Sequence, residues 1–106
     1  MVTLEAIKPL IVEKLKPLNP EKIIVFGSFA YGTPSEESDL DICVVKKDYE
    51  NKWEDKKKIR EALRDIDIAK DILNPKADEY EFYKNDYGSV YKDINDKGVV
   101  LWQKTS

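Results

Sequence analysis

The chain has 106 residues, a formal net charge of −3 and 42% hydrophobic residues, which predicts one domain with a modest core, spanning residues 1–106. The acidic balance argues against stable binding of nucleic acid through a basic face. Because the sequence has no histidine, histidine general bases and zinc sites with imidazole ligands are excluded, and any metal has to be held by oxygen. A single cysteine, Cys43, and the lack of an apolar N-terminal run of signal-peptide or membrane length predict a cytoplasmic protein.

The first half of the chain predicts one helix and two strands. Apolar residues at helical spacing predict an amphipathic helix over about residues 3–16, disturbed by Pro9. The segments 22–26 and 41–45 each contain a continuous apolar run, which predicts two strands that are buried on both faces. Residues 32–35 between them have the composition of a loop.

The second half of the chain predicts three more helices and two more strands. Asn74 and Pro75 are expected to provide the N-cap and first turn of the middle helix. The resulting order, α-β-loop-β-α-β-α-α-β, predicts an α/β (α+β) domain with a small mixed sheet flanked by helices. The predicted elements lie at about residues 52–65 (helix), 68–73 (strand), 75–84 (helix), 89–97 (helix) and 99–103 (strand).

Three aspartates lie within or at the mouths of these strands. Because alternate residues of a strand point to one face, Asp39 and Asp41 should project together, with Cα atoms about 6.6 Å apart. Paired carboxylates repel each other unless a cation lies between them, and hard oxygen ligands favour Mg²⁺. If the third strand lies beside the second, Asp71 joins them. Three carboxylates can hold two ions about 3.5–4 Å apart, an arrangement that supports in-line phosphoryl transfer.

A glycine and a serine between the first two strands supply the features of a phosphate site. Gly27 lets the backbone approach a phosphate, and a helix that begins at Ser28 would direct unpaired N–H groups at the anion. Gly32 is expected to allow a tight exit from that helix. Lys46 and Lys47 follow the second strand and are expected near the triphosphate. A Gly-Ser turn or an Asp-x-Asp sequence alone is weak evidence for a phosphate or metal site. The prediction of such a site depends on their combination.

The sequences Gly27-Ser28, Gly32 and Ser38-Asp39-Leu40-Asp41 resemble the signature of the DNA polymerase β-like nucleotidyltransferase superfamily. More narrowly, the short length and the closing segment 96–102 look like the minimal nucleotidyltransferase (MNT) family. The resemblance implies Asp39, Asp41 and Asp71 as catalytic and metal-binding residues for two Mg²⁺ ions, Gly27 and Ser28 as nucleotide-binding residues, and ATP as substrate. Asp71 is the third carboxylate only if the strand prediction excludes Asp65 and Asp67. Many members of the family have arginine at the position of Tyr31. The roles that remain for this tyrosine are core packing and contact with a nucleotide base.

The same resemblance implies a partner. Minimal members usually pair with a small helical HEPN ribonuclease toxin and silence it by adenylylating a tyrosine. This predicts a protein adenylyltransferase antitoxin. The alternatives are an antitoxin that acts by binding alone and an enzyme that modifies a small molecule or an RNA end.

Two other groups of residues have simpler explanations. Cys43 is expected in the core. Four of the six tyrosines lie near helical spacing, and core packing is expected to account for most of them, with a partner-binding surface as the alternative. These four are Tyr80, Tyr83, Tyr87 and Tyr91.

Overall fold

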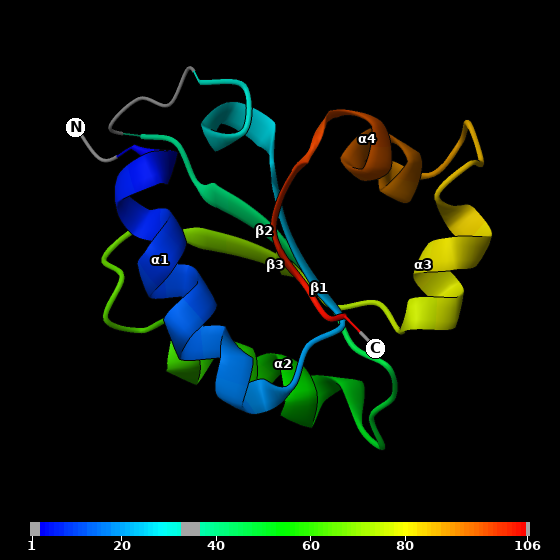
Figure 1. Ribbon diagram of the computed structural model, residues 1–106, viewed down its shortest axis with the longest axis horizontal. Coiled ribbons are helices and arrows are strands. Elements are labelled where there is room, and N and C mark those ends of the chain that lie inside the picture. Colours follow the sequence, from blue (N-terminus) through cyan, green and yellow to red (C-terminus); the bar gives the residue numbers. More distant parts are fainter. Residues whose placement is uncertain (1–2, 33–36, 106) are drawn as a thin grey trace.

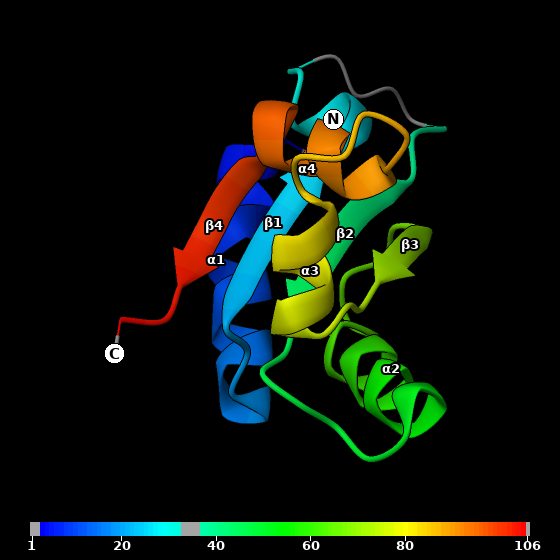
Figure 2. The same cartoon turned by 90° about the vertical axis from the view of Figure 1, so that its right-hand side faces the viewer.

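The computed structural model describes residues 3–32 and 37–105. This part of the chain forms a four-stranded mixed sheet in the order β3-β2-β1-β4, with helices on both faces (Figures 1 and 2). Strand β1 pairs antiparallel with β2 and β4, and β2 pairs parallel with β3. The elements are α1 (Leu4–Leu15), η1 (Lys16–Leu18), β1 (Lys22–Phe26), η2 (Gly27–Phe29), β2 (Leu40–Val45), α2 (Lys52–Ala62), β3 (Lys70–Leu73), α3 (Ala77–Tyr83), α4 (Val90–Lys97) and β4 (Val99–Gln103). Over the described ranges, no helix has both the length and the apolar character needed to cross a membrane.

The central strand β2 is apolar on both faces because each face packs against a different helical layer. Ile42 and Val44 belong to the cluster that contains buried residues of α1 and α2. Cys43 and Val45 belong to a second cluster, which includes residues of α3 and α4. Figure 1 shows these helical pairs on opposite sides of the sheet. The prediction that the apolar runs form strands buried on both faces is therefore confirmed.

The predicted elements are all present, and several of them are shorter than expected. The helix predicted over 52–65 ends at Ala62, and the strand predicted from residue 68 begins at Lys70. The last helix has Ser89 as N-cap, whose hydroxyl oxygen accepts a hydrogen bond from the N–H of Tyr91 at 3.1 Å. The predicted loop at 32–35 falls, beyond its first residue, outside the described residues.

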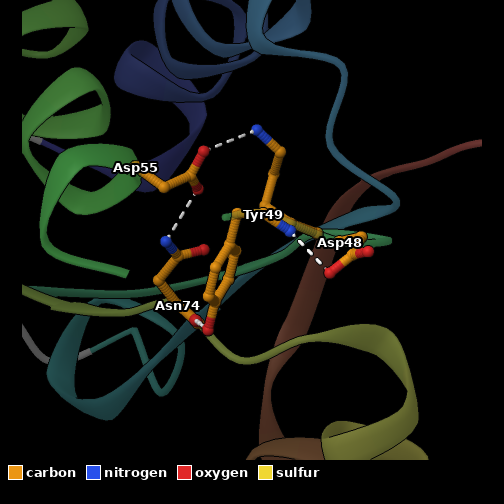
Figure 3. A network of polar contacts seen from close by, with 5 residues as sticks. Asp48, Tyr49, Asp55 and Asn74 are labelled. Atoms are coloured by element: carbon orange, nitrogen blue, oxygen red, sulfur yellow. Dashed lines mark hydrogen bonds and ion pairs between the residues drawn. The ribbon is translucent and has the colours of Figure 1, made fainter. Parts of the chain in front are cut away.

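The predicted N-cap role of Asn74 is wrong. Helix α3 has Lys76 as its N-cap residue, without a side-chain cap hydrogen bond. Asn74 is buried instead, and its amide Nδ2 donates a hydrogen bond of 2.8 Å to the Asp55 carboxylate on α2 (Figure 3). The other Asp55 oxygen lies 3.1 Å from the Lys46 ammonium. The Tyr49 hydroxyl donates a hydrogen bond of 2.9 Å to the backbone carbonyl oxygen of Asn74. This network joins the ends of β2 and β3 to the beginning of α2.

The predicted packing of the four clustered tyrosines holds for two of them. Tyr80 is 2% exposed, and Tyr91 packs against the same core cluster, with ring centroids 5.9 Å apart. Tyr83 and Tyr87 are 39% and 92% exposed. Their spacing is helical only in part, because Tyr87 lies between α3 and α4 rather than on either helix.

Cys43 should be chemically inert in the folded protein. Its side chain is fully buried, and burial raises the pKa of its thiol to about 12. Since the thiolate is the reactive form, we expect alkylation in native buffer to be about a thousandfold slower than in urea. The labelling rates of folded and unfolded chain, compared by mass spectrometry at the same pH, check this. Equal rates would contradict the burial of Cys43.

Candidate functional site

The structure brings two of the predicted aspartates side by side. Asp41 of β2 is the register partner of Asp71 on the parallel strand β3, and of Phe26, the last residue of β1, on its other side. Asp39 lies just before β2. Because alternate residues share a face, Asp41 lies on the same face of the sheet as Cys43, which is the face covered by α3 and α4. The condition set by the sequence, that the third strand lies beside the second, is met.

The choice of Asp71 over its neighbours follows from the sheet. Asp65 lies before β3 and its carboxylate is 3.4 Å from the Lys14 ammonium of α1. Asp67 is exposed and also precedes the strand. Only Asp71, among these three, takes a register position beside Asp41.

Gly27 lies directly against Asp41. It has a left-handed backbone with φ +73°, and a Cβ atom at this position would overlap the Asp41 carboxylate oxygen and lie 3.1 Å from its Cγ. The helix predicted to begin at Ser28 is present as a short 3₁₀ helix, Gly27–Phe29, which begins one residue earlier. The backbone carbonyl oxygen of Gly27 accepts hydrogen bonds from the N–H groups of Ala30 at 3.0 Å and Tyr31 at 3.1 Å. The N–H groups of Ser28 and Phe29 precede these donors, in the first turn.

The electrostatics of this end of the sheet favour a cation. The pKa of Asp41 is raised, first by burial and then by the negative charges of Asp71 and Asp39. Within residues 3–32 and 37–105, no group of three or more acidic or cysteine side chains is already gathered so that it could hold a metal ion. The donor set still fits Mg²⁺, because all three side chains offer hard carboxylate oxygens and a cation would relieve their repulsion. Nucleotide phosphates and water commonly complete such sites.

Two predictions about nearby residues are changed by the structure. Lys46 and Lys47 follow the far end of β2 from Asp41, so they do not lie near the predicted phosphate site. Lys46 instead pairs with Asp55. Tyr31 is 55% exposed, so core packing is not its main role.

The contact between Gly27 and Asp41 can be tested with a matched pair of variants. Gly27 and Gly32 have similar left-handed backbones, with φ values of +73° and +76°, but a Cβ at Gly32 would meet nothing within 4 Å. Alanine at either position should cost about 1–2 kcal/mol of unfolding free energy from backbone strain. Only Gly27→Ala should also displace the Asp41 carboxylate and reduce nucleotide binding. Urea unfolding and nucleotide titration of both variants measure the two effects. Equal nucleotide binding by the two variants would contradict a site at Asp41.

The arrangement of Gly27, Asp39 and Asp41 around two strand ends agrees with the family comparison. Residues 7–101 match the family model described as a nucleotidyltransferase domain. The chain belongs to the nucleotidyltransferase domain family. No curated protein sequence matches this nucleotidyltransferase domain significantly.

Solved structures confirm the predicted fold of this nucleotidyltransferase domain. A chain from a toxin-antitoxin crystal structure with AMP-PNP is 24% identical, with a TM-score of 0.63 over 92% of this chain and 73% of that chain. A chain from the toxin-antitoxin MntA-HepT is 17% identical, with a TM-score of 0.63 over 94% and 73%. A chain from a tri-AMPylated Shewanella oneidensis HEPN toxin in complex with MNT antitoxin is 20% identical, with a TM-score of 0.59 over 96% and 74%. The domain has the polymerase β-like nucleotidyltransferase fold.

Proposed function

We propose that this nucleotidyltransferase domain is an antitoxin that transfers AMP from ATP to a tyrosine of a HEPN-type ribonuclease toxin. The observation that carries the proposal is the register pairing of Asp41 with Asp71 beside Gly27, in a chain of the nucleotidyltransferase domain family. The choice of acceptor is supported by the similar solved structures, which include toxin-antitoxin complexes and an AMPylated HEPN toxin.

Each residue of the site has a role in this proposal. Asp39 and Asp41 would hold one Mg²⁺ and Asp71 would help to hold a second, which together neutralise charge on the triphosphate. Gly27 and Ser28 would bind phosphate oxygens through backbone N–H groups and the serine hydroxyl.

The transfer step forms a bond between the acceptor hydroxyl oxygen and the α-phosphorus of ATP. The bond from that phosphorus to the oxygen bridging to the β-phosphate breaks, and pyrophosphate leaves. The hydroxyl proton passes to the exposed carboxylate of Asp71, which is placed in register beside Asp41.

Intact mass spectrometry of the partner tests the proposal. The chain is incubated with ATP, Mg²⁺ and the HEPN protein of the same organism, and the HEPN protein should gain the mass of one or more AMP groups. Omitting Mg²⁺ or adding a chelator should abolish the gain. An equal gain with the Asp39→Asn and Asp41→Asn variants would contradict the assigned site.

The same materials separate the two alternatives. Asp39→Asn/Asp41→Asn protein that still neutralises the ribonuclease at equal concentration would show that binding alone suffices. Radiolabel from ATP that enters RNA or a small molecule of a cell extract, and not the HEPN protein, would show a different acceptor. Either result would overturn the proposed protein adenylyltransferase.

A further inference from the structure

The segment from the end of α3 to the beginning of α4 exposes four large apolar side chains. Phe82 is 76% exposed, Tyr83 39%, Tyr87 92% and Val90 49%. They belong to the end of α3, the connection that follows it and the first residue of α4, segments that face the viewer in Figure 2. We call these four residues the α3–α4 aromatic surface. Exposed aromatic residues of this kind are enriched where proteins bind proteins.

The side chains of this surface are partly ordered by contacts with one another and with lysine. The rings of Phe82 and Tyr83 meet edge to face, with centroids 4.8 Å apart. The Lys92 ammonium lies 4.7 Å from the centroid of the Tyr87 ring and also pairs with the Asp96 carboxylate at 2.6 Å. Pre-ordered aromatic side chains lose less conformational entropy on binding than free ones.

The surroundings of the α3–α4 aromatic surface are acidic. Lys84 pairs with Glu81, so two of the three lysines are engaged by acids within the segment. A basic partner face is therefore complementary in charge. Residues 77–97 carry six acids, Asp78, Glu79, Glu81, Asp86, Asp93 and Asp96, against three lysines, Lys84, Lys92 and Lys97.

The position of this surface relates it to the candidate active site. The helices α3 and α4 cover the face of the sheet on which Asp41 lies, as judged from the shared alternation with Cys43. By contrast, Trp53 is 82% exposed but belongs to α2, on the opposite face. A protein docked on α3 and α4 is on the correct side of the sheet to present a hydroxyl to Asp41 and Asp71.

We propose that the α3–α4 aromatic surface docks the toxin that carries the acceptor tyrosine. This inference rests on the proposed function. A ribonuclease that binds RNA needs a basic face to contact the phosphate backbone. A basic face that also carries apolar side chains is complementary to an acidic surface with exposed aromatic residues.

The experiment compares the Phe82→Ala/Tyr87→Ala variant with a control variant, Trp53→Ala. Binding to the HEPN protein of the same organism is measured by calorimetry, and AMP transfer is measured as a function of HEPN concentration. The double variant should bind at least about tenfold more weakly, with the KM for the HEPN protein raised and the affinity for Mg²⁺-ATP unchanged. Trp53→Ala should behave as wild type, and added salt should weaken wild-type binding.

The possible results separate this inference from the proposed function. Wild-type affinity in the double variant, or a larger loss in Trp53→Ala, would overturn the docking surface even if AMP transfer occurs. Weaker binding by the double variant without any AMP transfer by wild type would support the docking surface and overturn the proposed function. Self-association of wild type that the double variant abolishes, without HEPN binding, would assign the surface to a second copy and overturn the inference.

Discussion

The Asp41→Asn variant is expected to lose AMP transfer by on the order of 1,000-fold, because a metal-binding carboxylate contributes several kcal/mol to the transition state and about 1.36 kcal/mol is a factor of ten in rate. Asp41 lies against Gly27 and beside Asp71 in register, so in the proposed site its substitution should affect phosphate and metal binding together. Initial rates at saturating Mg²⁺-ATP check this. Asp67→Asn is the matched control, since it removes the same charge from an exposed position before β3.

The same Asp41→Asn variant should unfold at a higher temperature than wild type when no metal is present. The raised pKa of Asp41 means that the folded protein binds this proton more tightly than the unfolded chain. The stabilisation is complete below the unfolded pKa, near 3.8, and is lost as the pH rises through the folded value. At neutral pH the ionised carboxylate therefore destabilises the fold, and asparagine removes this effect.

The stability gain of Asp41→Asn should shrink as the pH falls toward the unfolded pKa of 3.8, because the raised pKa of folded Asp41 means that wild type takes up this proton before that point. Thermal unfolding of both proteins across this pH range measures the difference. A variant that is less stable than wild type at neutral pH would contradict the repulsion among the three carboxylates. Full AMP transfer by the same variant would contradict its role in the site.

The sequence was sufficient to predict the strands and the pairing of the carboxylates. The run at 42–45 is apolar throughout because it lies between two helical layers, and such a run is typical of a strand that is buried on both faces. Alternation also predicts that Asp39 and Asp41 share a face, which stays a prediction because Asp39 lies just before β2. The position of Asp71 beside Asp41 needed a neighbouring parallel strand, which the α2 crossover between β2 and β3 provides.

The failed predictions have different physical causes. Asn74 has the local sequence of a helix N-cap, but its side chain bonds to Asp55, 19 residues away. Lys46 follows the end of a strand that begins at the site, so the length of β2 places it at the opposite end from Asp41. The exposure of Tyr83 and Tyr87 depends on where α3 ends, because a helical spacing continued past that end does not describe one face.

The Asp55→Ala variant is expected to lose about 3–5 kcal/mol of unfolding free energy, because removing one partner of a buried ion pair leaves an uncompensated charge. The side chains of Lys46 and Asp55 are 11% and 10% exposed. The substitution also removes the acceptor of the Asn74 amide, whose carbonyl Oδ1 already has no hydrogen-bond partner among the described residues. Such a loss is a large part of the about 5–15 kcal/mol typical of a domain. Urea unfolding measures it.

The control for Asp55→Ala is Asp48→Ala, which removes an exposed ion pair with Lys76 at the same distance, 3.1 Å. Exposed pairs contribute about 0–1 kcal/mol, so Asp48→Ala should be close to wild type. A Lys46→Met/Asp55→Leu variant should recover most of the stability lost in Asp55→Ala, because paired apolar replacements remove the unmatched charge. Equal losses in Asp48→Ala and Asp55→Ala would mean that burial does not strengthen the Lys46–Asp55 pair. Because the pair lies at the far end of β2 from Asp41, Mg²⁺-ATP affinity should be unchanged in any of these variants that remains folded.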